Sequence, residues 1–173
     1  MRIEIVKRAA FRVCGYAVTT SLTQYGHAPA QKELFENYFR DERPANIAAV
    51  ADNPAELYGL AWLVTRPGDR IQYLLGSAVT GNPPLPAGAI IKEVAPATYA
   101  MTRLDPEMSL QQGWMEFFYI AGGQIGYSPD YHHDVWFERL PTGVHGPTEL
   151  WMAVTNSVPS WADQQSLPEY FRF

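Results

Sequence analysis

Glu138 lies in the stretch DVWFERL, where one carboxylate stands among aromatic and aliphatic residues. The alternation predicts a β-strand in which Trp136, Glu138 and Leu140 share one face. A carboxylate among aromatic rings can hold a flat organic cation, because the charge attracts the cation and each ring face adds about 0.5 to 2 kcal/mol. Alternatively, Glu138 pairs with an arginine, such as Arg103 or Arg139 of a neighbouring chain, or lies on an exposed sheet face.

Neighbouring strands supply further candidates for a ligand site. In the stretch ELWMAV, Leu150 and Met152 suit a face covered by helices, so Glu149 and Trp151 should point away from the helices. Trp151 is a candidate for lining a cleft, whereas Glu149 could equally be a solvated residue at the start of its strand. Strand parity adds five aromatic residues, for which a place in the core stays open: Tyr16, Tyr99, Trp62, Tyr73 and Trp136.

Other reactive residue types lack the setting that catalysis or metal binding needs. The stretch DYHHD has side chains that suit a metal, but adjacent histidines on an extended segment point apart, so it indicates a solvated loop. AGGQIG follows a helical pattern, which is typical of a helix end and not of a phosphate loop. Neither Cys14 nor the four histidines show a nucleophile arrangement. We therefore expect no metal and no cofactor.

The composition of the 173 residues is that of a globular domain, with 47% hydrophobic residues and a net charge of -5. Because the basic residues are scattered, the chain is not expected to bind nucleic acid directly. Cys14 is the only cysteine, which excludes an intramolecular disulfide and fits a reducing cytoplasm. No apolar run reaches about 18 residues, so we expect a soluble, cytoplasmic protein that does not cross a membrane.

The first half of the chain predicts two strands, a helix and two more strands. The helix is expected over Pro29–Asp41, where apolar residues recur at helical spacing, and Pro44 is expected to end it. A turn at Pro67–Arg70 joins the two following strands. The proline-rich stretch Asn82–Gly88 then predicts a linker, because it can continue neither a helix nor a strand ladder.

The second half repeats this order of elements, with a helix expected over Ser109–Gly122. GYAVTT in the first half aligns with TYAMTR in the second, which places Tyr16 and Tyr99 at matching positions across a pseudo-twofold axis. We predict an α+β fold made of two strand-helix-strand-strand modules. Its antiparallel sheet carries the helices on one face and a ligand cleft on the other.

These halves form one predicted domain over residues 1–155, divided at about residues 1–81 and 88–155. Residues 156–173 form a C-terminal extension. The extension is expected to pack on the domain or on a partner subunit, because four of its residues are aromatic: Trp161, Tyr170, Phe171 and Phe173.

The sequence resembles the GyrI-like small-molecule-binding domains, which also occur as effector domains of MerR-type and AraC-type multidrug-responsive regulators. Five stretches and their order carry the resemblance: Tyr73–Val79, Glu93–Leu104, Leu110–Phe118, Phe137–Leu140 and Glu149–Val154. It implies two modules about a pseudo-twofold axis, with a ligand cleft between them. In that family a buried glutamate and aromatic residues hold cationic, aromatic compounds.

By position, the resemblance matches that glutamate to Glu138, and it matches Glu149 and Trp151 to a second acid and an aromatic residue of the same cleft. It implies a stand-alone binder of amphipathic, cationic or aromatic small molecules. One alternative is a hydrolase of reactive cyclopropane-bearing compounds with Glu138 as general base. Another is an inhibitor-like protein that binds gyrase. A homodimer or a partner protein is compatible with each.

Overall fold

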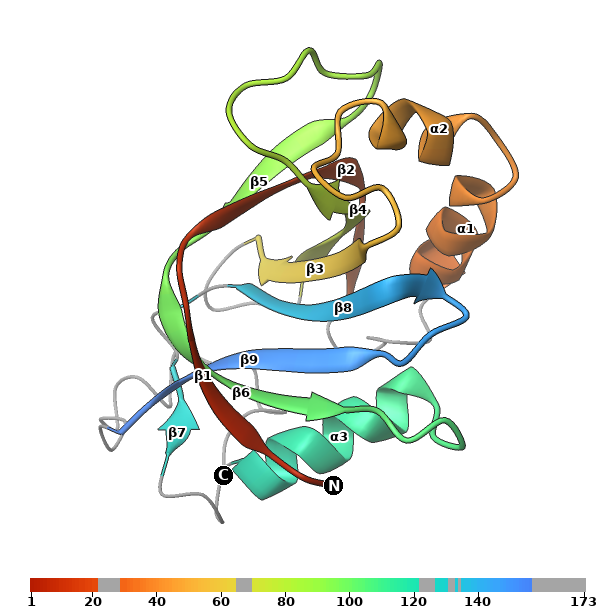
Figure 1. Ribbon diagram of the computed structural model, residues 1–173. Helices are drawn as coiled ribbons and strands as arrows, with labels where there is room; N and C mark the ends of the chain where they lie inside the picture. Colours follow the sequence, from red (N-terminus) through yellow and green to blue (C-terminus); the bar gives the residue numbers. More distant parts are fainter. Residues whose placement is uncertain (22–28, 65–69, 122–126, 131–132, 134, 157–173) are drawn as a thin grey trace.

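The computed structural model describes residues 1–21, 29–64, 70–121, 127–130, 133 and 135–156, and the elements within these residues are shown in Figure 1. In chain order they are β1 (Glu4–Arg8), β2 (Phe11–Ser21), α1 (Pro29–Tyr38), α2 (Arg43–Ala48), β3 (Leu57–Leu63), β4 (Arg70–Ala78), β5 (Ile90–Val94), β6 (Ala97–Arg103), α3 (Leu110–Ala121), β7 (Ser128–Pro129), β8 (Val135–Val144) and β9 (Glu149–Thr155). The predicted α+β class is confirmed. Most of the predicted turn after β3 and nearly all of the C-terminal extension lie outside the described residues.

The helices differ from the prediction near Pro44. Helix α1 ends at Tyr38, and Pro44 lies in the first turn of a separate short helix, α2, which the sequence analysis did not predict. A proline is tolerated there because the first turn leaves its backbone N–H groups without intrahelical partners. Helix α3 begins as predicted, since the Ser109 hydroxyl accepts from the backbone N–H of Gln112 at 3.2 Å while the Gln112 side chain accepts from the Ser109 backbone N–H at 3.1 Å.

The sheet has the strand order β1-β6-β9-β8-β3-β4-β2-β5, and all of these neighbours are antiparallel, while the short β7 pairs with β9. Strands β3 and β8 meet at the centre. Each is followed outward by two strands of its own half, β4 and β2 on one side and β9 and β6 on the other. The strand order is therefore symmetric about the β3–β8 pair, as a pseudo-twofold fold requires.

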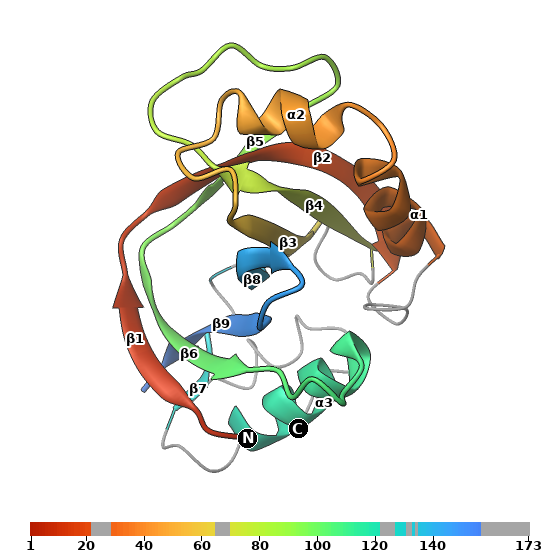
Figure 2. The same ribbon diagram turned by 45° about the vertical axis from the view of Figure 1, so that its right-hand side comes forward.

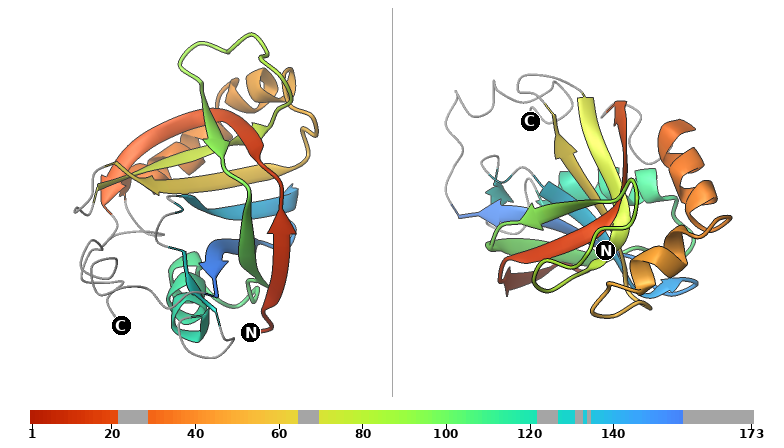
Figure 3. Two further views of the ribbon diagram at one scale, coloured as in Figure 1. Left: turned by 90° about the vertical axis from the view of Figure 1, so that its left-hand side faces the viewer. Right: turned by 90° about the horizontal axis from the view of Figure 1, so that it is seen from above.

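The first strand of each half pairs with a strand of the other half. Strand β1 pairs with β6, from Glu4 opposite Met101 to Arg8 opposite Ala97. Strand β2 pairs with β5 in the same continued register, beginning with Phe11 opposite Val94. As a result, β1–β2 and β5–β6 form two long arms that run side by side (Figure 3, left). The sheet edge of each half is therefore covered by the first strand of the other half.

The sheet therefore has a core on each face. Figure 2 shows the arms curving round one face, while α1 and α3 lie against the other. The buried members of the helix-side core are Cys14, Tyr16, Leu34, Tyr38, Ile47, Leu57, Ala61, Ile71, Tyr73, Leu75, Val79, Ala89, Ala100, Trp114, Phe117, Trp136, Leu140, Leu150, Met152 and Val154. Those of the arm-side core are Val13, Tyr58, Leu60, Trp62, Leu74, Val94, Tyr99, Met101, Val135, Phe137, Trp151 and Ala153.

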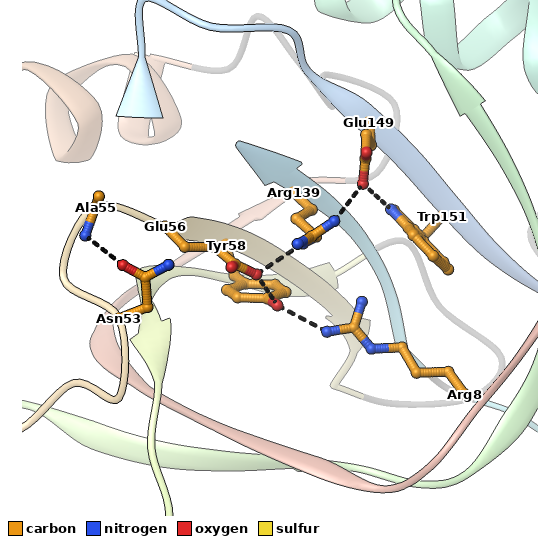
Figure 4. Close-up of polar contacts among 8 residues, drawn as sticks. All are labelled: Arg8, Asn53, Ala55, Glu56, Tyr58, Arg139, Glu149 and Trp151. Atoms are coloured by element: carbon orange, nitrogen blue, oxygen red, sulfur yellow. Dashed lines mark hydrogen bonds and ion pairs between the residues drawn. The ribbon is translucent and has the colours of Figure 1, made fainter. Parts of the chain in front are cut away.

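Hydrogen bonds and ion pairs centred on Arg139 form a polar bridge on the arm-side face (Figure 4). Its Nε donates to Oε1 of Glu56 at 2.7 Å, and its Nη1 donates to Oε2 of Glu149 at 3.0 Å. Trp151 Nε1 donates to the same Glu149 oxygen at 3.1 Å. The bridge thus ties the segment before β3 to β8 and β9, and Glu149 is only 5% exposed.

Burial raises the pKa of Glu56, but hydrogen bonds from Arg139 and Tyr58 and the charges of Arg139 and Arg8 outweigh it, so that the pKa is lowered overall. A lowered carboxyl pKa means that the bridge stabilises the fold fully above the ordinary value of 4.5. This contribution is lost as the pH falls through the lower pKa of the folded protein.

We predict that Arg139→Met lowers the free energy of unfolding by about 2 to 3 kcal/mol, because it leaves the buried Glu149 carboxylate and the half-buried Glu56 carboxylate without the Arg139 guanidinium. Urea denaturation at neutral pH measures the loss. The difference from the wild type should shrink in acid as Glu56 becomes protonated.

The matched control is Arg40→Met, because Arg40 is 72% exposed and lies 3.8 Å from Glu36 on the helix surface. It should cost no more than about 1 kcal/mol. Equal losses from the two substitutions would show that the Arg139 bridge does not stabilise the fold.

Candidate functional site

Glu138 is buried on the helix-covered face of the sheet, with 1% of its surface exposed. Its Oε1 accepts a hydrogen bond from Nε1 of Trp114 at 2.7 Å, and its Oε2 accepts one from the hydroxyl of Tyr73 at 3.1 Å. Trp114 comes from α3 and Tyr73 from β4, so the carboxylate joins a helix to the sheet. The predicted shared face of Trp136, Glu138 and Leu140 is confirmed, since both neighbours are in the helix-side core.

A glycine makes room for this carboxylate. Gly59 of β3 lies directly opposite Glu138 of β8. A Cβ atom at residue 59 would come closer than 3.0 Å to both the Tyr73 hydroxyl and Oε2 of Glu138. Glycine has no Cβ, so the hydroxyl and the carboxylate occupy the space where a side chain would otherwise lie.

The environment of Tyr73 keeps its hydroxyl protonated. Burial raises the pKa of Tyr73 well above its ordinary value, and the charge of Glu138 and their shared hydrogen bond raise it further. Tyr73 therefore remains a neutral donor to Glu138. Other aromatic rings share this core, including Trp136, Phe117 and Tyr16.

The expectation that Glu138 and Trp151 share the face opposite the helices is wrong, because only Trp151 lies on that face. In the register of β8 and β9, Glu138 lies opposite Leu150, while Phe137 lies opposite Trp151. Residues directly opposite each other in a sheet share a face, so Trp151 belongs with Phe137 under the arms. Their rings stack at 5.6 Å with an interplanar angle of 9°.

The eight predicted site residues thus divide between two faces. Glu138, Tyr73, Trp136 and Tyr16 are on the helix side. Glu149, Trp151, Tyr99 and Trp62 are on the arm side, where Glu149 pairs with Arg139 and Lys92 lies 4.8 Å from the Trp62 ring. One shared cleft was expected, but four of these residues lie on each face of the sheet, and within the helix-side four the contact that carries the site is that of Glu138 with Tyr73.

Tyr16 and Tyr99 occupy equivalent strands, β2 and β6, but they are not equivalent residues. Tyr16 is in the helix-side core and Tyr99 is in the arm-side core, where its hydroxyl lies 3.1 Å from Nε2 of His133. Two residues related by a twofold axis perpendicular to a sheet must lie on the same face. Because side chains alternate along a strand, the predicted alignment is displaced by an odd number of residues.

Sequence reasoning did not identify three residues that shape these sites: Trp114, Gly59 and Glu56. Trp114 lies within the helix predicted over Ser109–Gly122, and a buried indole N–H usually has an acceptor, which was a usable signal. Gly59 within a strand was another, because an interior glycine often marks a close approach. Glu56 is the residue just before β3, and its contact with Arg139 depends on how β3 and β8 pair, which alternation along one strand does not give.

The helix-side arrangement is chemically suited to hold a positive charge. A buried carboxylate costs free energy unless hydrogen bonds or a cation compensate it, and here two neutral donors orient both oxygens. Among the described residues no group of three or more histidine, cysteine, aspartate or glutamate side chains is placed to hold a metal ion. Within the same part of the chain, no helix is long and apolar enough to span a membrane.

Comparison with known structures supports the fold. An integron cassette protein from the mobile metagenome of Vibrio cholerae, VCH_CASS2, superposes with a TM-score of 0.66 at 16% identity, covering 88% of this chain and 95% of that one. SAV2435 bound to tetraphenylphosphonium gives 0.71 at 16% identity, with 90% and 94% covered. The C-terminal domain of EcmrR gives 0.61 at 10% identity, with 90% and 98% covered. No curated protein sequence matches the chain.

A family model described as Cass2, integron-associated effector binding protein, matches residues 4–154. The match extends from β1 to the end of β9 and includes both arms, both cores and Glu138. The chain therefore belongs to the Cass2 family of integron-associated effector binding proteins, which is a GyrI-like family.

Proposed function

We propose that this protein binds lipophilic organic cations at Glu138, on the helix-covered face of the sheet. The observation that carries the proposal is a carboxylate, 1% exposed, fixed by Trp114 and Tyr73 within a core rich in aromatic rings. A carboxylate in such surroundings attracts a cation strongly, because water screens the charge poorly there. The ring faces favour a cation with a large apolar surface.

The relative SAV2435 supports the ligand class, since its structure was solved with tetraphenylphosphonium bound. That compound carries one positive charge within four aromatic rings. It cannot donate a hydrogen bond, so only the charge and the apolar surface can hold it. We therefore use tetraphenylphosphonium as the probe.

Binding requires the structure around Glu138 to open. The carboxylate is almost fully buried, and Trp114 of α3 contacts one of its oxygens directly. We propose that an incoming cation takes its place beside Oε1 of Glu138 by displacing the Trp114 indole. Tyr73 would keep the other oxygen in position.

The same geometry favours a binding role over a hydrolase. A general base must take a proton from water, and it needs an accessible oxygen for that step. Here Tyr73 holds Oε2 of Glu138, and the other oxygen is covered by Trp114 in the free protein and by the cation in the proposed bound state. A carboxylate held in this way is better suited to act as a fixed negative charge.

We predict that Glu138→Gln weakens tetraphenylphosphonium binding by about 1.5 to 3 kcal/mol, the contribution of a charged contact. This corresponds to roughly tenfold to a hundredfold in Kd. Titration calorimetry measures the affinity, and circular dichroism verifies that the variant is folded. The affinity for a neutral aromatic ligand of similar size should be nearly the same in Glu138→Gln as in the wild type.

Glu149→Gln is the matched control, because it removes an equally buried carboxylate from the opposite face of the sheet. It should lower stability by disturbing the Arg139 bridge and leave tetraphenylphosphonium affinity unchanged. If Glu149→Gln lost the affinity and Glu138→Gln kept it, the ligand would bind on the arm side and the proposal would be wrong.

We also predict that Gly59→Ala weakens tetraphenylphosphonium binding, because the added methyl group must push the Tyr73 hydroxyl or the Glu138 carboxylate from its position. The substitution should also lower the free energy of unfolding by about 1 to 3 kcal/mol, the usual cost of overpacking a core. The variant is measured in the same titration. Unchanged affinity would mean that the contact between Tyr73 and Glu138 does not shape the site.

A further inference from the structure

A second cluster of aromatic rings surrounds the guanidinium of Arg8 on the arm side of the sheet. The central carbon of the guanidinium lies 4.1 Å from the ring centre of Phe11, 5.4 Å from Tyr58, 5.3 Å from Phe137 and 5.2 Å from Trp151. All four distances are within the range of a cation–π contact. We call these four rings the Arg8 cage.

Arg8 lies at this cage because β1, the first strand of the N-terminal half, pairs with β6 of the other half. Arg8 is the last residue of β1 and pairs with Ala97 of β6, whose small side chain takes up little space. Phe11 follows at the start of β2, while the other three rings come from the central strands β3, β8 and β9. The arms therefore place a cation over rings that belong to the sheet.

Polar groups complete the cage, as Figure 4 shows. Nη2 of Arg8 donates to the Tyr58 hydroxyl at 2.7 Å, and that hydroxyl donates to Oε1 of Glu56. Glu56 also accepts from Arg139, which donates in turn to Glu149. The chain of contacts ends where Trp151 donates to Glu149.

The charges of this group balance only while Arg8 is in place. Arg8 and Arg139 carry two positive charges, and Glu56 and Glu149 carry two negative ones. Without Arg8, the group has one net negative charge beside four ring faces and a phenol oxygen. Such a combination selects small cations with delocalised or methylated charge.

We propose that the Arg8 cage is a second cation-binding site, for alkylguanidinium or methylated ammonium groups, and that Arg8 is its built-in competitor. Arg8 belongs to β1, an edge strand whose one partner among the described strands is β6. It is also half-buried, so part of this side chain is exposed to solvent. An external cation occupies the cage by replacing the guanidinium, which belongs to the same chain and therefore competes with it intramolecularly.

In the test, Arg8→Ala removes the guanidinium from the cage. Methylguanidinium or tetramethylammonium chloride is then added to the variant at matched ionic strength. The melting temperature of Arg8→Ala should rise when either cation is added. The apparent affinity of Arg8→Ala for the cation should be about tenfold higher than that of the wild type, which is the size of one cation–π contact. Arg12→Ala is the matched control. Arg12 lies on the same arm but donates to the exposed Asn82 side chain, so the control should respond no more than the wild type.

A second substitution separates the two ligand types. Tyr58→Phe in the Arg8→Ala background keeps the ring and removes the hydroxyl oxygen that accepts from the guanidinium. It should weaken methylguanidinium binding and spare tetramethylammonium, which cannot donate a hydrogen bond. A loss for both cations, or for neither, would contradict the assigned contact.

Two outcomes would overturn the proposal. One is an Arg8→Ala protein that responds to the cations no more than the Arg12→Ala control, which would leave Arg8 as a structural anchor of β1. The other is an Arg8→Ala protein that does not fold and is not restored by methylguanidinium. Tetraphenylphosphonium binding at Glu138 should be retained in Arg8→Ala, so the proposal for the Arg8 cage and the proposal for Glu138 are tested separately.

Discussion

The antiparallel pairing of β3 with β8 at the centre of the sheet determines what each face carries. On the helix side this pairing sets Gly59 opposite Glu138, which gives a buried carboxylate the space it needs. On the arm side it sets Tyr58 opposite Arg139, which forms the start of the polar bridge. A shift of one residue between these two strands would exchange the faces and bury the arginine under the helices.

Much of the local structure could be predicted from the sequence, because it depends on neighbouring residues. The alternation of Trp136, Glu138 and Leu140 predicted their shared face, and the same rule placed Leu150 and Met152 under the helices. The capping pair Ser109 and Gln112 fits the predicted start of α3. The positions of the strands and the α+β class follow from such local patterns.

The division of the site into two faces could not be predicted in this way. Alternation shows which residues of one strand lie together, but the register between strands decides which face of the next strand joins them. Glu138 and Trp151 were therefore each assigned correctly within a strand and wrongly relative to each other. The exchange of β1 and β5 between the halves is also non-local, so it left no pattern in either half.

That exchange means that neither half of the chain contains a complete sheet. Each half ends in an edge that only the other half's first strand covers, as in a dimer whose subunits have swapped a strand. Linking the two halves in one chain turns this association into an intramolecular step with a high effective concentration. It also makes folding depend on contacts between residues far apart in sequence, such as Glu4 and Met101, so the N-terminal half cannot complete its fold before the second half is available.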